Sequence, residues 1–153
     1  RIVRATGDNP LVSACLAEKN LKLPEKNCPD LSRYRGGPYG SGVEVVEADA
    51  LFRSLENSED PIEHEHITTY ILRNPDIFKV MEIVCPKTYF FPEARVTLDT
   101  EEDYRFLKNI FDDLYIDRPV KTIELIKWLK KNHSLQTGRS VKSGSKEFLL
   151  SQG

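Results

Sequence analysis

The sequence predicts an α/β protein with a mostly parallel sheet. Segments with the two-residue alternation of strands are followed repeatedly by segments with the three-to-four-residue spacing of helices. This alternation is typical of α/β folds, in which each helix carries the chain back to begin the next parallel strand. With 153 residues, of which 39% are apolar and 30% charged, the chain is long enough for one domain with a substantial core.

The composition argues against several classes of protein. The formal net charge of −2 disfavours a nucleic-acid-binding protein, which usually carries a basic excess. No apolar run approaches the ~20 residues of a membrane helix, and no charged-then-apolar leader precedes the first strand. Cys15, Cys28 and Cys85 lack the spacing of metal or redox motifs. We therefore expect reduced thiols and a cytoplasmic protein with no nucleic-acid or membrane partner.

The first third of the chain contains one expected strand, one helix and a long loop. Ile2 and Val3 belong to a short β-prone run that the turn at 7–8 ends, and a short helix is expected within 11–20. Residues 23–41 contain three prolines and a Gly-Gly pair, and this composition predicts a long loop. Loops of this length in compact domains are usually functional or mobile.

The middle third alternates strands and helices. A strand is expected over 43–46 and a helix over 48–55, followed by a second helix from Pro61 that ends at Asn74-Pro75. The run "IFKVMEIV" at 77–84 is a further strand. The apolar face of the first of these helices consists of Ala48, Leu51, Phe52 and Leu55.

The last third opens with the most legible segment, "ARVTLDTEEDYRFLKNIFDDL". A strand is expected over 95–98, and Thr100 with Asp103 forms the capping box of a helix. The apolar stripe of this helix consists of Tyr104, Leu107, Ile110, Phe111 and Leu114. A further amphipathic helix over 122–132 has Thr122 as its expected cap. The domain is thus expected to cover 1–132, and the remaining residues, 133–153, form a polar tail.

Two aspartates occupy equivalent places in this pattern. Asp8 and Asp99 each follow a predicted strand, and ligands of open parallel sheets bind at the carboxyl ends of the strands. Two carboxylates at that edge suit Mg²⁺, which takes one or two carboxylates together with substrate phosphates. The alternative is that both residues merely begin turns, because aspartate is common there.

Four segments, in order, resemble a known family. They are "RATGDNPLV", "YGSGVEVVEADAL", "EHITTYILRNPDIFKV" and "ARVTLDTEEDYRFLKNIF". Each is similar to a motif of the bacterial cytidylyltransferases of the spore-coat polysaccharide type, which are relatives of the CMP-Kdo and CMP-sialate synthetases. The resemblance covers about residues 1–131. It implies the Rossmann-like nucleotide-diphospho-sugar transferase fold and transfer of CMP from CTP to a sugar, with release of pyrophosphate.

The resemblance also implies roles for individual residues. Asp8 and Asp99 match the family's catalytic, Mg²⁺-binding aspartates. The positions that match substrate-binding residues are Arg4, Tyr39, Glu44, Glu65 and His66. An acidic sugar such as a Kdo- or sialate-like acid is the family's usual acceptor. The chain departs from the motifs at Gly40, where the family has proline, and at Glu44, where it has aspartate. Arg4 and Glu44 also have a plainer interpretation as solvated strand charges.

The family's phosphate-cradling Gly/Arg/Lys-rich loop has no counterpart in this sequence. We therefore expect the C-terminal portion of the domain only, weak or inactive alone, with a homodimer or the missing N-terminal half as partner alongside CTP and a sugar. One alternative is a degenerate, non-catalytic interaction module of the same fold. Another is a glycosyltransferase of related fold that binds metal through Glu47 and Asp49, although their place at a helix start favours a dipole role.

Overall fold

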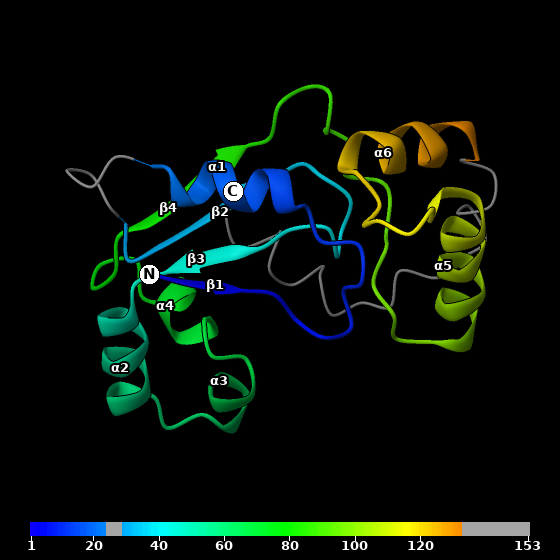
Figure 1. Ribbon diagram of the computed structural model, residues 1–153. Coiled ribbons are helices and arrows are strands. Elements are labelled where there is room, and N and C mark those ends of the chain that lie inside the picture. The colour runs from blue at the N-terminus through cyan, green and yellow to red at the C-terminus, as the bar shows by residue number, and fades with distance from the viewer. Residues whose placement is uncertain (24–28, 133–153) are drawn as a thin grey trace.

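The computed structural model describes residues 1–23 and 29–132, so the predicted polar tail at 133–153 lies outside the described residues. Its centre is a four-stranded sheet in the order β1-β3-β2-β4 (Figure 1). The strands are β1 (Ile2–Arg4), β2 (Leu31–Arg35), β3 (Glu44–Val46) and β4 (Val80–Val84). β3 is antiparallel to both β1 and β2, and β4 is parallel to β2. Three of the four strands therefore run in one direction, and their carboxyl ends share one edge.

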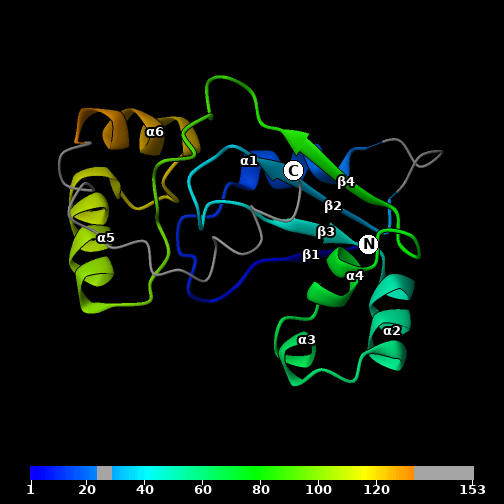
Figure 2. The same ribbon diagram turned by 180° about the vertical axis from the view of Figure 1, so that it is seen from behind.

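Helices cover both faces of the sheet and one of its ends. They are α1 (Ala14–Leu21), α2 (Ala48–Asn57), α3 (Pro61–Glu65), α4 (Thr69–Arg73), α5 (Glu101–Leu114) and α6 (Thr122–Lys131). Figure 1 shows α1 in front of the sheet, and Figure 2, from behind, shows α4 on the opposite face. In both views α5 and α6 lie beyond one end of the strands, away from α2 and α3. This arrangement confirms the α/β class.

Two apolar clusters stabilise these layers. The sheet cluster joins the inner strands to α2 and α4 and consists of Leu31, Val46, Ala50, Ile71 and Phe78. The helical cluster consists of Leu11, Ala94, Val96, Phe106, Leu107, Ile110, Leu125, Trp128 and Leu129. Because the extended segment 94–98 packs on the helical cluster, α5 and α6 hold this segment beside the ends of the strands.

The expectation of one uninterrupted loop over 23–41 is wrong, because β2 lies inside it. β2 pairs with β3 on one side and β4 on the other, and Leu31 is fully buried. The prolines and glycines that suggested a loop flank the strand, while the charged residues Arg33 and Arg35 within it disguise its pattern. Pairing with neighbours distant in sequence decides the structure here.

The expected helix over 61–74 is interrupted. α3 ends at Glu65, His66 has backbone angles of φ −106° and ψ 77°, and α4 begins at Thr69. The Thr68 hydroxyl donates a hydrogen bond to Glu44 at 2.9 Å, so a tertiary contact is made at the interruption.

Two further boundaries differ from expectation. The strand expected over 95–98 is reduced to a single parallel bridge between Arg95 and Tyr39. α6 does begin at Thr122, but its N-cap is Lys121, whose backbone N–H donates to the Glu124 carboxylate at 3.3 Å. The Thr122 hydroxyl instead makes a hydrogen bond of 2.7 Å with the Ser13 hydroxyl. This bond links the start of α6 to the start of α1, so the hydroxyl does not cap its own helix.

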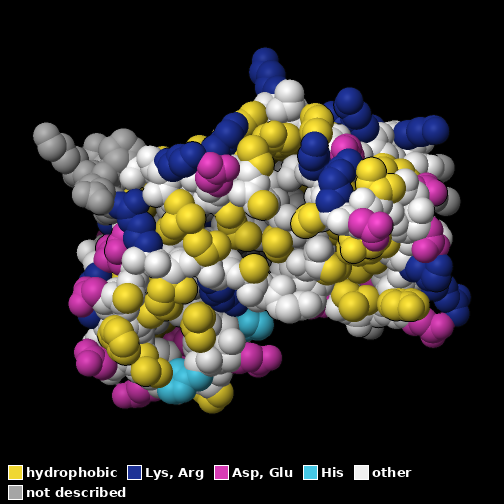
Figure 3. Space-filling model, in the orientation of Figure 1, with side chains coloured by type: hydrophobic (Ala, Val, Ile, Leu, Met, Phe, Trp, Pro, Cys, Tyr) yellow, Lys and Arg dark blue, Asp and Glu magenta, His cyan; other side chains and the backbone are white. Residues whose placement is uncertain are grey.

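The apolar face expected on α2 is only partly covered. Phe52 and Leu55 are 66% and 62% exposed, and they border a groove that Ile2 and Ile67 also line. Apolar side chains are visible over this region at the lower left of Figure 3. Within the described ranges, every helix is too short or too polar to span a bilayer.

Candidate functional site

Segments of three motifs meet beyond the carboxyl end of β1. The backbone N–H of Leu98 donates to the carbonyl of Asp8 at 2.8 Å, which joins the first motif to the fourth. Tyr39 joins the second motif to the fourth, since its N–H donates to Ala94 at 2.8 Å and its carbonyl accepts from Val96 at 2.7 Å. Side chains far apart in the sequence therefore share one site.

A cavity of about 320 Å³ opens at this junction. Five of the residues predicted from the sequence line it, namely Arg4, Asp8, Tyr39, Glu44 and His66. Asp99 is not among the lining residues, but it follows the lining residue Thr97 by two positions. Glu65, which is exposed at the end of α3, is not among the residues that line this cavity.

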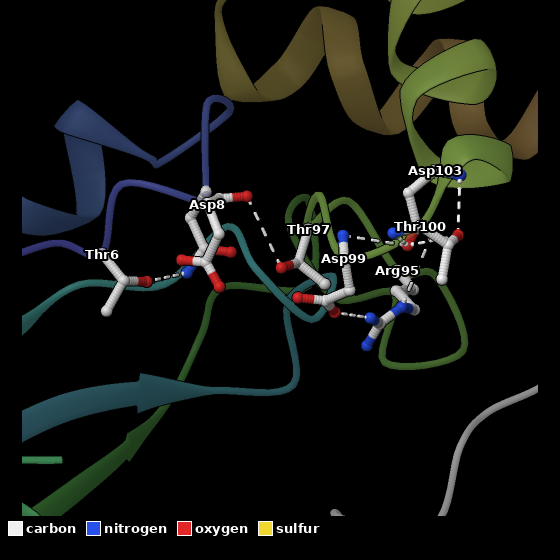
Figure 4. A network of polar contacts seen from close by, with 8 residues as sticks. Thr6, Asp8, Arg95, Thr97, Asp99, Thr100 and Asp103 are labelled. Atoms are coloured by element: carbon white, nitrogen blue, oxygen red, sulfur yellow. Dashed lines mark hydrogen bonds and ion pairs between the residues drawn. The ribbon is translucent and has the colours of Figure 1, made fainter. Parts of the chain in front are cut away.

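The two candidate metal-binding aspartates lie on adjoining segments (Figure 4). Thr97 lies between them, and its hydroxyl donates to the Asp8 carbonyl at 3.5 Å. Carboxylate, hydroxyl and carbonyl oxygens are the hard donors that Mg²⁺ prefers. In the described part of the chain, no three histidine, cysteine or acidic side chains gather as a metal cluster. A pair of carboxylates nevertheless fits Mg²⁺, which completes its shell with water and substrate phosphates.

The cap of α5 fixes the backbone at Asp99. The carboxylate of Asp103 accepts hydrogen bonds from the N–H groups of Asp99 and Thr100, at 3.1 and 2.9 Å, and from the Thr100 hydroxyl at 2.9 Å. The Thr100 hydroxyl in turn accepts from the Asp103 N–H at 3.1 Å, so the predicted capping box is confirmed. Asp103 is only 3% exposed, so a buried carboxylate holds the backbone at Asp99 in place.

A ladder of alternating charges crosses the sheet and forms one wall of the cavity. Arg4 of β1 binds Glu44 of β3 at 2.8 Å, and Glu44 also lies 3.6 Å from Arg33 of β2. Arg33 continues the ladder to Glu82 of β4 at 2.6 Å. Thr68 donates to the same Glu44 carboxylate as Arg4. Arg4 and Glu44 are therefore partly buried partners and not the solvated strand charges of the plainer interpretation.

The ladder makes a prediction about stability. Replacing Glu44 with glutamine leaves Arg4 and Arg33 without their shared anion, and we expect a loss of about 1.5–3 kcal/mol, typical of hydrogen bonds to charged groups. Urea unfolding followed by circular dichroism measures this loss. The matched control is Glu101→Gln on α5, which breaks the exposed ion pair with Arg105 and should change stability little. Equal stability of the two variants would contradict a structural role for Glu44.

Some residues of the site were not found from the sequence. Arg33, Asn9 and Thr97 all line the cavity. Asn9 and Thr97 lie inside the motifs that resemble the family, but asparagine and threonine at these positions do not by themselves indicate a role. Arg33 was hidden because its strand was interpreted as loop, and its regular two-residue spacing with Arg35 was the signal that could have revealed it.

The acidic pair of the glycosyltransferase alternative lies outside the cavity. Glu47 binds Arg1 at 2.9 Å, and Asp49 is 82% exposed and binds Arg53 at 2.9 Å. Two further side chains of types that can bind metals, His64 and Cys85, have structural partners or surroundings instead. His64 is hydrogen-bonded to the carbonyl of Ser58 at 2.9 Å, and burial raises the pKa of the Cys85 thiol.

Comparisons with known proteins identify the family of the chain. The chain is 33% identical over 138 residues to the uncharacterized protein MJ1063 of Methanocaldococcus jannaschii, covering 88% of this chain and 55% of that protein. It is 31% identical over 142 residues to the spore coat polysaccharide biosynthesis protein SpsF of Bacillus subtilis, covering 92% and 59%. A solved cytidylyltransferase from Leptospira borgpetersenii superposes with a TM-score of 0.78 at 28% identity, covering 92% and 60%.

The chain thus spans little more than half the length of these relatives. The sequence model of one family, described as cytidylyltransferase, matches residues 1–143. The matched region contains all four motifs and every residue that lines the cavity. Together these findings show that the chain belongs to the cytidylyltransferase family.

Proposed function

We propose that this chain is the part of a cytidylyltransferase that holds the metal and the acceptor sugar. The observation that carries the proposal is that the segments of Asp8 and Asp99 are joined by a backbone hydrogen bond beside a cavity lined by the other motif residues. Family membership supports CTP as the cytidylyl donor. With this function we also propose a cytoplasmic location.

In the proposed reaction a hydroxyl oxygen of the sugar attacks the α-phosphorus of CTP, and the hydroxyl proton is released to solvent. The bond from that phosphorus to the bridging oxygen breaks, and pyrophosphate leaves with the bonding electrons. Asp8 and Asp99 would hold Mg²⁺, which when bound neutralises phosphate charge and orients the triphosphate. The backbone at both aspartates is held by hydrogen bonds. The Asp8 carbonyl accepts from the Leu98 N–H, and the Asp99 N–H donates to the Asp103 carboxylate.

The cavity wall supports an acidic sugar, such as a Kdo- or sialate-like acid, as the acceptor. Arg4 and Arg33 present cationic groups beside the exposed His66 and Tyr39, and these side chains can donate to carboxylate and hydroxyl oxygens. Glu44 anchors the two arginines and limits their movement. Glu65 is proposed to contribute only when substrate is bound, because it does not line the cavity here.

The open edge of β1 supports a partner for the sheet. β1 pairs with β3 on one side, and Ile2 and Val3 are each 43% exposed. An unpaired strand edge is a template for a further strand. The relatives are longer than this chain. We propose that the N-terminal half implied by the family resemblance pairs here and completes the nucleotide site. A homodimer through the same surface is the competing outcome.

The test is Mg²⁺-dependent release of pyrophosphate from CTP in the presence of a nine- or eight-carbon sugar acid. We expect little turnover by the chain alone and clear turnover by the chain joined to the N-terminal segment of SpsF. Chelation of the metal should abolish it. No turnover by the joined protein with any sugar acid, and no binding of CTP, would leave a non-catalytic module of this fold as the function. Sedimentation of the chain alone as a dimer would support the competing partner.

A further inference from the structure

Arg95 lies between Asp99, a proposed metal-binding carboxylate, and Tyr39, which lines the cavity. The four motifs assigned no role to Arg95. Its guanidinium is ion-paired with Asp99 and lies 3.8 Å from the buried carboxylate of Asp103. The guanidinium carbon also lies 5.3 Å from the centroid of the Tyr39 ring, on the segment that lines the cavity. A single side chain thus contacts two carboxylates and an aromatic ring.

The contact with Asp99 determines how that carboxylate is turned. Arg95 binds one oxygen, Oδ2, and Figure 4 shows the other carboxylate oxygen on the side of Asp8. Asp99 is 47% exposed, and without a partner its side chain would sample several rotamers. The Asp103 carboxylate cannot hold Asp99 as Arg95 does, because like charges repel and its Oδ2 atom already accepts from the α5 cap.

We propose that Arg95 is a positioning residue that presents the free oxygen of Asp99 to the divalent cation. This inference rests on the proposed function, in which Asp8 and Asp99 bind that cation. Carboxylates that ligate metals are commonly held by hydrogen bonds from a surrounding shell, and loss of such a partner typically weakens metal binding about 10–100-fold. The planar fork of arginine suits two carboxylates and a ring at once, whereas the point charge of lysine does not.

Arg95 also connects the proposed cation site to Tyr39, which lines the cavity for the acceptor. Tyr39 forms the parallel bridge with Arg95 through its backbone and receives the guanidinium on its ring. The ring is 55% exposed at the cavity, so a shift of Arg95 moves a surface that faces the acceptor. Occupation of the cation site and placement of Tyr39 are therefore coupled through one side chain.

Titration of the full chain with Mn²⁺, followed by the electron paramagnetic resonance of the free ion, tests the proposal. We expect binding by the unaltered chain, its loss in Asp99→Asn and affinity about 10–100-fold weaker in Arg95→Ala. Arg95→Lys should recover part of this loss at most. The matched control is Arg105→Ala, which removes an exposed arginine with the same i,i+4 spacing to an acidic residue and should bind Mn²⁺ normally.

The outcomes separate the two proposals. Binding that is lost in Asp99→Asn but unchanged or tighter in Arg95→Ala overturns the positioning role and leaves the metal site standing. Equal weakening in Arg95→Ala and Arg105→Ala shows an effect of net charge and also overturns it. Absence of binding by the unaltered chain overturns both proposals. Thermal unfolding of each variant without metal establishes that weakened binding is not caused by loss of the fold, and Arg95→Lys serves if Arg95→Ala does not fold.

Discussion

Replacing either Asp8 or Asp99 with asparagine should lower kcat/KM for cytidylyl transfer by about 10²–10⁴-fold, because a metal ion supplies several kcal/mol of charge stabilisation in such reactions. Asparagine keeps the size of the side chain but removes the anionic ligand. The measurement is pyrophosphate release by the chain joined to the N-terminal segment of a longer relative. Since Asp8 is exposed and Asp99 is 47% exposed, the variants should remain folded.

Two control variants sharpen this prediction. Asp112→Asn removes an exposed carboxylate that pairs with Lys108 on α5, and it should leave the rate unchanged. Asp49→Asn tests the glycosyltransferase alternative, because Asp49 lies on α2 and binds Arg53 outside the cavity. If Asp49→Asn abolished turnover while Asp99→Asn kept it, the metal would have to bind at α2 and the proposed site would be wrong.

Local signals in the sequence were sufficient for the elements that are stabilised locally. The capping box of Thr100 and Asp103 fixed the start of α5 correctly, because its hydrogen bonds join residues three positions apart. The apolar spacing located Leu107 and Ile110 in the core, yet Tyr104 is 57% exposed and Phe106 packs in its place. Which residues of a stripe are buried depends on where the neighbouring helix crosses, and the stripe does not contain this information.

The elements that were missed depend on partners distant in the sequence. The composition around β2 predicts a loop, because the stability of this strand comes from pairing with β3 and β4 rather than from its own residues. The site follows the same division. The motifs and the ends of the predicted strands indicate Asp8 and Asp99. The roles of Arg33 and Arg95 depend instead on ion pairs in the folded chain, with Glu82 and Asp99 respectively. Tertiary contacts of this kind override local propensity.

Gly40 is the position at which substitution should harm the fold of the site most. Its φ of +89° lies in the left-handed region, and a Cβ built there would stand 2.8 Å from the backbone nitrogen of Thr97 and 2.9 Å from Oδ1 of Asn9. Such a backbone conformation costs an L-residue about 1–3 kcal/mol, and the backbone nitrogen cannot move aside without breaking the junction of the motifs.

We therefore expect Gly40→Ala to lower the free energy of unfolding by at least about 1–3 kcal/mol, and Gly40→Pro to be worse, since proline requires φ near −65°. The second substitution is informative because the motif that this segment resembles has proline at the matching position, so introducing the motif's residue should damage this chain. Gly42→Ala is the matched control, as a Cβ there meets nothing within 4 Å. Urea unfolding compares the three variants. If Gly40→Pro were as stable as Gly42→Ala, the loop would have to tolerate φ near −65° at position 40. The close approach of Gly40 to Thr97 and Asn9 would then not be required for the fold of the site.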